Sequence, residues 1–265
     1  MTYWQFHFIY TLPVLVILSL ALFFKKIKPS KTAWMGLGLL TLLAIVYTTP
    51  WDNYLVYKKV WGYPETGVSM TFGYVPIEEY FFFVVQTFIS SFFVFIFIFT
   101  EKSWLQRQAP ESFRINWFFL IVGTSLCFTF AGLTWSAINI ESVGLRQYVY
   151  LLLILSWSLP VFCLQWIFGA DLLWQNKRLF IIGVAVPTIY FSFVDSLALE
   201  SGIWHLSPTY TTGVLIANLP IEEALFFVVT NMMVVQGMIL FLHPQSARRL
   251  TGVFRYGNYL RSESY

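Results

Sequence analysis

The sequence predicts an all-α, polytopic membrane protein with seven transmembrane helices. Its 265 residues are 58% hydrophobic and 11% charged, whereas a soluble globular domain carries about 25% charged residues. The mean hydropathy of +0.68 leaves too little polar surface to cover a water-soluble globule. Seven apolar runs are each long enough to cross a hydrocarbon core of roughly 30 Å as a helix. They lack the alternation of apolar and polar residues that is typical of barrel strands.

The seven predicted helices fill most of the chain up to residue 242. The first begins near the N-terminus and is followed by a lysine-rich loop, and the second ends close to Asp52. The third begins at Pro76, the fourth is a connector, and the fifth and sixth lead to Asp195. The seventh begins at Pro220 and runs into a basic tail. The predicted bounds are 3–24, 33–51, 76–99, 116–138, 148–169, 179–197 and 220–242.

The basic residues predict the orientation of the chain in the membrane. If the N-terminus is outside, 13 of the 16 lysines and arginines fall on the cytoplasmic side: Lys25, Lys26, Lys28, Lys31, Lys102, Arg107, Arg114, Lys177, Arg178, Arg248, Arg249, Arg255 and Arg261. The other three are Lys58, Lys59 and Arg146. The positive-inside rule therefore favours N-out and C-in, and we expect a multi-pass protein of the cell membrane. No basic residue precedes the first run, so no cleavable signal peptide is expected, and the net charge of +3 gives no reason to expect nucleic acid.

An internal repeat relates the two halves of the chain. Residues 76–85 and 220–229 are identical at eight of ten positions, at an offset of 144. Further matches pair Tyr47, Asp52 and Trp61 with Tyr190, Asp195 and Trp204 at an offset of 143, and residues 12–14 with residues 159–161 at 147. Because one helix connects the halves, we predict parallel repeats that share a site at their interface. The predicted units are a three-helix repeat (1–115), a linker helix (116–147), a second three-helix repeat (148–242) and a basic cytoplasmic tail (243–265).

Six carboxyl groups are predicted to converge at the outer face. Each copy of Pro-Ile-Glu-Glu begins a helix there, and an aspartate closes another helix at the same face. In a single copy, proline at the first helical position and acids in the first turn are explained by helix start preferences of about 0.3 to 1 kcal/mol. Two copies beside apolar helices favour function, because a charge deep in a bilayer costs about 2.5 to 3.5 kcal/mol. The candidate catalytic residues are Glu78, Glu79, Glu222, Glu223, Asp52 and Asp195.

Adjacent glutamates in a poorly hydrated place cannot both ionise easily. A neutral carboxylic acid beside a carboxylate is the arrangement that general acid and general base catalysis requires. Most of the aromatic residues are membrane anchors or packing, but some crowd the acids, and a ring face stabilises a desolvated cation by about 2 kcal/mol. An acid with aromatic walls inside a membrane predicts the protonation of a hydrocarbon. The candidate substrate-binding residues are Trp51, Trp61, Tyr80 and Trp204.

Several other classes of protein are excluded by missing residues. No lysine lies in a predicted span, so a retinal Schiff base has no nucleophile. Neither a Gly-x-Gly-x-x-Gly nor a Gly-x-x-x-x-Gly-Lys motif is present, so no nucleotide cofactor is expected. The three histidines are scattered and there is no Asp-x-x-x-Asp run, so no metal is expected. A hard cation bound by the acids with Asn53 and Asn218 remains an alternative.

The two copies of Pro-x-Glu-Glu, each preceded by an Asp-containing helix end and a loop with Trp, resemble the membrane-integral lycopene cyclases of some bacteria, archaea and fungi. That family has two homologous three-helix units, separate or fused, and residues 1–242 resemble a fused form. The resemblance implies cofactor-free cyclisation of the linear ψ-ends of lycopene to β-rings, through γ-carotene to β-carotene. It implies lycopene and the lipid bilayer as partners, and an association with other carotenoid enzymes is a further possibility. There is no sign of the flavin-binding region of a different, larger cyclase family.

The family motif carries over onto both glutamate pairs. In the family the second acidic position can be Asp, so the resemblance favours Glu78 and Glu222 as the essential acid and base. Which half donates the proton and which accepts it stays open. Two alternatives also remain: a cyclase that forms an ε-ring or acts on a C50 carotenoid, and a small proton-coupled transporter built from parallel repeats.

Overall fold

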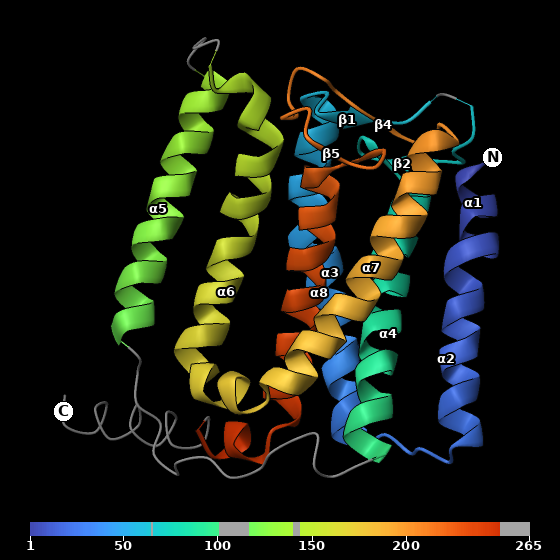
Figure 1. Ribbon diagram of the computed structural model, residues 1–265, viewed down its shortest axis with the longest axis vertical. Helices are drawn as coiled ribbons and strands as arrows, with labels where there is room; N and C mark the ends of the chain where they lie inside the picture. Colours follow the sequence, from blue (N-terminus) through green and yellow to red (C-terminus); the bar gives the residue numbers. More distant parts are fainter. Residues whose placement is uncertain (65, 101–116, 140–143, 250–265) are drawn as a thin grey trace, which may run out of the picture.

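The computed structural model describes residues 1–64, 66–100, 117–139 and 144–249, and it confirms a helical fold with seven long apolar helices (Figure 1). All seven are long and apolar enough to cross a membrane. The first crossing runs through α1 (Tyr3–Phe6), the π-helical turn η1 (His7–Thr11) and α2 (Leu12–Phe24). The others are α3 (Lys31–Tyr57), α4 (Ile77–Thr100), α5 (Trp117–Asn139), α6 (Val149–Gln175) after the 3-10 turn η2 (Arg146–Tyr148), α7 (Lys177–Glu200) and α8 (Ile221–Leu242).

Three helices are longer than predicted. The predicted second helix ended at residue 51, but α3 continues past Pro50 to Tyr57; a proline is tolerated in membrane helices because neighbouring groups satisfy the freed backbone. The predicted fifth and sixth helices are likewise extended, to Gln175 and Glu200. Asp52 and Asp195 were predicted to close their helices. Each lies instead inside its helix, slightly more than one turn before the end.

The helices α4 and α8 form the centre of the bundle. In their most apolar stretches 67% and 56% of the residues are buried, compared with 6% in α5. The helix α4 packs against α2, α3, α7 and α8, while α8 packs against α3, α4, α6 and α7. The connecting helix α5 lies at the edge of the bundle, along α6 (Figure 1). The two helices that begin with the glutamate pairs are therefore the ones with the most protein around them.

In the described part of the chain, three two-stranded sheets, which the sequence did not predict, cover the end of the bundle that carries the N-terminus (Figure 1). Hairpin β2 (Thr71–Phe72) with β3 (Val75–Pro76) leads into α4, and hairpin β5 (Leu215–Ile216) with β6 (Leu219–Pro220) leads into α8. The strands β1 (Trp61–Gly62) and β4 (His205–Leu206) join the two outer loops, with Gly62 opposite His205. These two residues are 143 positions apart, the offset of the repeat.

The turn of the first hairpin requires glycine. Gly73 has a φ of +71°, and a Cβ atom at this position would lie 2.2 Å from the side-chain oxygen of Asn53. That oxygen accepts a hydrogen bond from the backbone N–H of Tyr74 at 2.7 Å. Asn53 belongs to α3, so this contact fixes the hairpin before α4 to the helix that carries Asp52.

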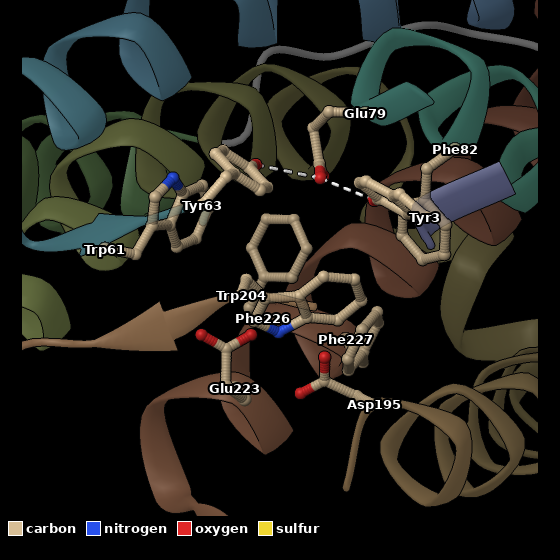
Figure 2. A pocket seen from close by; sticks show the side chains of 10 residues that line it. All are labelled: Tyr3, Trp61, Tyr63, Glu79, Phe82, Asp195, Trp204, Glu223, Phe226 and Phe227. Carbon is tan, nitrogen blue, oxygen red and sulfur yellow. Dashed lines mark hydrogen bonds between the residues drawn. The ribbon is translucent and has the colours of Figure 1, made fainter. Parts of the chain in front are cut away.

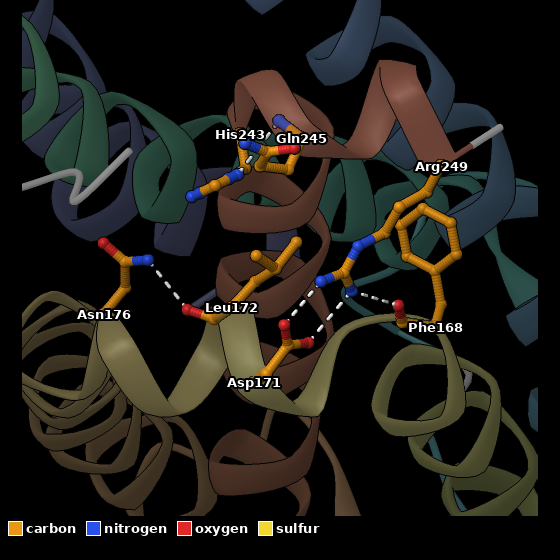
Figure 3. Close-up of polar contacts among 7 residues, drawn as sticks. All are labelled: Phe168, Asp171, Leu172, Asn176, His243, Gln245 and Arg249. Carbon is orange, nitrogen blue, oxygen red and sulfur yellow. Dashed lines mark hydrogen bonds and ion pairs between the residues drawn. The ribbon is translucent and has the colours of Figure 1, made fainter. Parts of the chain in front are cut away.

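An ion pair at the opposite end holds the chain after α8 against α6 (Figure 3). Gly169 has a non-helical backbone and kinks α6. Arg249 donates a hydrogen bond to the carbonyl of Phe168 at 2.8 Å and pairs with Asp171 on the same kinked segment. The guanidinium thus ties the segment after α8 to the kinked part of α6. The rest of the predicted tail, residues 250–265, and the predicted basic loop with Lys102, Arg107 and Arg114 lie outside the described residues.

Candidate active site

Four carboxyl groups from four helices lie buried beneath the small sheets. Asp52 comes from α3, Glu79 from α4, Asp195 from α7 and Glu223 from α8, with 0%, 8%, 2% and 4% of each residue exposed. Glu79 and Glu223 are the titratable neighbours of both aspartates. Uncompensated burial of four charges would be very costly. The cluster is therefore expected to retain protons, which is the property that an acid catalyst for a hydrocarbon needs.

A cavity of about 30 Å³, here called the acid cavity, lies between three of these carboxyls. In Figure 2 Glu79 lies on one side of it, Asp195 and Glu223 lie on the other, and aromatic rings stand between them. A water molecule needs roughly 10 to 15 Å³ of cavity volume, so the acid cavity has room for a few waters at most. Its lining residues are Tyr3, Trp61, Tyr63, Glu79, Phe82, Asp195, Trp204, Glu223, Phe226 and Phe227.

Two phenol groups donate hydrogen bonds to the same oxygen of Glu79 (Figure 2). The Tyr3 hydroxyl lies 2.6 Å and the Tyr63 hydroxyl 3.0 Å from Oε2. Desolvation, and then the Glu79 carboxylate, raise the pKa of Tyr63 well above its ordinary value. Tyr63 thus stays a hydrogen-bond donor at any physiological pH. Two donors of this kind stabilise negative charge on Glu79.

Glu223 accepts one such bond, from the Tyr150 hydroxyl to Oε1 at 2.8 Å. Tyr3 and Tyr150 did not appear among the sequence candidates, although they are 147 positions apart and share the offset of residues 12–14 and 159–161. Extending that alignment to the start of the first helix would have found them. The aspartates have fewer partners: both oxygens of Asp52 and Oδ2 of Asp195 have no hydrogen-bond partner among the described residues.

Glu78 and Glu222 have a different place from their neighbours. Oε1 of Glu78 accepts a hydrogen bond from the backbone N–H of Ser69 at 2.8 Å, and Oε1 of Glu222 accepts one from Thr212 at 2.7 Å. Neither residue lines the acid cavity. One step along a helix turns a side chain by about 100°, and this rotation points one glutamate of each pair to a loop and the other to the cavity. The geometry therefore favours Glu79 and Glu223 over Glu78 and Glu222 as the reacting groups.

The four predicted substrate-binding aromatics are not all brought together. Trp61 and Trp204 line the acid cavity. Trp51 does not line the cavity. Its ring stacks on Trp157 at 4.7 Å and on Phe226 at 5.8 Å between ring centres. The Tyr80 hydroxyl instead binds the carbonyl of Phe72 at 2.9 Å and the side chain of Asn53 at 2.8 Å, outside the cavity.

The amides proposed as cation ligands are engaged elsewhere. Asn53 accepts from the backbone of Tyr74, and the Asn218 amide donates to the carbonyl of Ser196 at 3.0 Å. Each amide thus fastens an outer loop to a helix that carries an aspartate. Within the described ranges no group of three His, Cys, Asp or Glu residues is placed to hold a metal ion.

The phenol donors give a first test of the cluster. Tyr150→Phe keeps the ring but removes the donor to the buried Glu223 carboxyl, and leaving a buried acceptor unpaired costs about 1 to 3 kcal/mol. We expect a lower midpoint of thermal unfolding for the purified variant in detergent. Tyr148→Phe is the matched control: residue Tyr148 is 38% exposed, so its substitution should leave the midpoint unchanged. Equal midpoints for the two variants would show that the Tyr150 bond contributes nothing to the fold.

Comparison with known proteins places the chain among carotenoid enzymes. The family model for lycopene cyclase matches residues 1–97 and 147–241. Lycopene beta-cyclase of Halobacterium salinarum is 37% identical over 206 residues, which are 78% of this chain and 81% of that protein. The bifunctional lycopene cyclase/phytoene synthase of Phycomyces blakesleeanus is 33% identical over 239 residues, 89% of this chain and 38% of that protein. No solved structure was found to match. The chain belongs to the lycopene cyclase family.

Proposed function

We propose that this protein is a lycopene β-cyclase that converts the linear ψ-ends of lycopene to β-rings by acid-base catalysis. The observation that carries the proposal is the buried cluster of carboxyls from α3, α4, α7 and α8, enclosed by aromatic rings. Family membership and the beta-cyclase of Halobacterium salinarum support the same substrate and product. The seven apolar helices fit a substrate that dissolves in lipid and not in water.

The reaction needs one proton in and one proton out. A carboxylic acid protonates C2 of the open end, and C1 becomes cationic. The C5=C6 double bond attacks C1, which forms the C1–C6 bond and moves the positive charge to C5. A carboxylate then removes the C6 proton, and the electron pair of that C–H bond restores a C5=C6 double bond. The product is an isomer of the substrate, so no oxidant or reductant is consumed.

The hydrogen bonds of the cluster support a division of roles. Glu79 has two phenol donors, which stabilise it as the carboxylate that accepts the C6 proton. Glu223 has one such donor and lies beside Asp195, so this pair can share a proton and donate it to C2. The rings of Trp61, Trp204 and Phe226 line the cavity between them and would stabilise the cation by about 2 kcal/mol per well-placed ring face.

We further propose that the site is built between two parallel repeats, residues 1–115 and 148–242, joined by the linker 116–147. Contacts between equivalent positions support this. The Gln86 side chain donates to the Thr230 hydroxyl at 2.8 Å, and the two are 144 positions apart. The hydroxyl of Tyr47 binds the carbonyl of Trp157, and the equivalent Tyr190 binds the carbonyl of Tyr10.

The charge distribution supports a cell-membrane protein with N-out, C-in orientation, which puts the acid cavity near the outer face. Glu79 and Glu223 are each the third residue of their helix. This position near one end of the bundle favours a cyclase over a proton-coupled carrier, whose site is expected near the midplane.

The proton itself provides the test of the proposed function. Purified protein given lycopene in D₂O, with no cofactor, is expected to place one deuterium per ring, on the carbon that was C2 of the open end. Chromatography against β-carotene identifies the ring type, and mass and NMR spectra locate the label. Rings without solvent deuterium, or turnover only with added reduced flavin, would contradict the acid-catalysed mechanism. A product with a different ring would contradict the β-cyclase assignment alone.

A further inference from the structure

A second and larger cavity, here called the side cavity, lies among α3, α4, α6 and α8. It has a volume of about 300 Å³, at the lower end of the range for small-molecule sites. Most of its lining is aliphatic or aromatic, for example Leu40 and Ala44 on α3, Val161 on α6 and Met233 on α8. A cavity of this composition fits a hydrocarbon and not a charged ligand.

One aromatic residue lines both the side cavity and the acid cavity. Phe226 lines both, and Trp51 stacks on its face at 5.8 Å with the two ring planes only 3° apart. Glu223, three residues before Phe226 on α8, also lines the acid cavity. A hydrocarbon in the side cavity would thus contact a residue that also lines the cavity of the carboxyls.

The side cavity faces the lipid between α3 and α6. Three of its lining residues are exposed on the outer surface of the bundle: Leu43 by 51%, Tyr47 by 40% and Leu164 by 70%. Toward the acid cavity, two hydrogen bonds tie α3 to α6. The Tyr47 hydroxyl donates to the carbonyl of Trp157 at 2.8 Å, and the Trp51 indole donates to the carbonyl of Leu153 at 3.1 Å. A ligand from the lipid would therefore enter sideways between α3 and α6, on the side of these two hydrogen bonds that is away from the acid cavity.

The equivalent place in the other half is filled. Thr48 lines the side cavity together with Phe83 and Phe226. The repeat offset of 143 places Phe191 at the position of Thr48. Phe191 is fully buried, and its ring centre lies 5.7 Å from those of Phe82 and Phe227. In the repeat, Phe82 is equivalent to Phe226 and Phe227 is equivalent to Phe83. The small side chain of Thr48 thus leaves open, in one half of the bundle, the space that Phe191 fills in the other half.

We propose that the side cavity is the single binding site for the polyene, and that it holds one end of the chain at a time. This proposal rests on the proposed function. The reacting end lies against Phe226 and reaches the carboxyls when that ring turns aside, while the rest of the C40 chain leaves between α3 and α6 into the bilayer. The second ring then requires release of the monocyclic product and rebinding by its other end.

Filling the cavity from two different helices tests the proposal. Thr48→Phe on α3 introduces the ring found at position 191, and Val161→Phe on α6 fills the same space from the opposite wall. A bulky ring in the cavity would clash with the bound polyene and weaken its binding constant about 10- to 100-fold. We therefore expect kcat/KM for lycopene to fall about 10- to 100-fold. Leu42→Phe is the matched control, since Leu42 is 57% exposed on α3 and does not line the cavity.

Each variant is assayed as the full chain in detergent after gel filtration, beside the wild type. If the wild type itself forms no ring, the proposed function fails, and the side cavity is then not a polyene site either. If the wild type is active and either correctly folded filling variant keeps wild-type kcat/KM, the side cavity is not the polyene site although the function stands. The wild-type time course adds a second criterion: monocyclic product must rise before bicyclic product, and its absence at every time point would overturn the one-end-at-a-time model.

Discussion

Replacing Glu79 or Glu223 with Gln is expected to lower ring formation by about 10²- to 10⁴-fold, the usual contribution of general acid-base catalysis. Gln has the same shape and still accepts the phenol hydrogen bonds that Tyr3, Tyr63 and Tyr150 donate. It can neither donate a proton to C2 of the polyene nor accept one from C6. The substitution therefore removes the chemistry and leaves the packing of the acid cavity in place.

The neighbouring glutamates supply the matched comparison. In Glu78→Gln and Glu222→Gln the side-chain oxygen can still accept from the backbone of Ser69 and Thr212, so we expect turnover close to wild type. Alanine at either position would instead remove the acceptor of these partly buried N–H groups, and a hydrogen bond of this kind contributes about 0.5 to 1.5 kcal/mol to stability. Turnover of purified variants, each normalised to folded protein, decides between the two pairs. Loss in the Gln variants of Glu78 and Glu222, with turnover kept in those of Glu79 and Glu223, would return the catalytic role to the first glutamate of each pair.

The different surroundings of the two glutamates in each pair could not be predicted from the sequence. Composition and the length of the apolar runs predicted the seven helices, and the ten-residue repeat predicted that both pairs begin a helix. Which glutamate faces the cavity depends on the helical register against the neighbouring helices. A repeat preserves that register in both halves, so it cannot distinguish one position of the pair from the next.

Among the residues around the acids, some could also be found from the sequence and others could not. Tyr3 and Tyr150 were recoverable from the alignment of the two halves, because they keep the same offset as residues 12–14 and 159–161. The asymmetry between Thr48 and Phe191 was also present in that alignment, but only packing against Phe82 and Phe227 shows that the ring fills a space. The two-residue strands carry no periodic pattern, so nothing in the sequence marked them.

Cutting the chain between α4 and α5 is expected to abolish activity in each fragment and to restore it when both are present. Residues 1–115 contain Glu79 with its donors Tyr3 and Tyr63, whereas residues 116–265 contain Glu223, Asp195 and Tyr150. Each fragment alone has only one wall of the acid cavity. It lacks either the proposed proton donor or the proposed acceptor, and should lose at least the roughly 10²- to 10⁴-fold that one such group contributes.

Co-expression should rebuild the site because the contacts between the fragments do not involve the residues at the cut. They include the β1–β4 pairing through Gly62 and His205, and the packing of α4 on α8 and on α7. Pigment chromatography of lycopene-accumulating cells gives the readout, and copurification shows assembly. The control is a co-expression in which the 1–115 fragment carries Glu79→Gln and the 116–265 fragment is wild type. This pair should assemble without making rings. Full activity from either fragment alone would contradict a site shared between the halves, because one fragment would then hold acid, base and polyene without the other's wall.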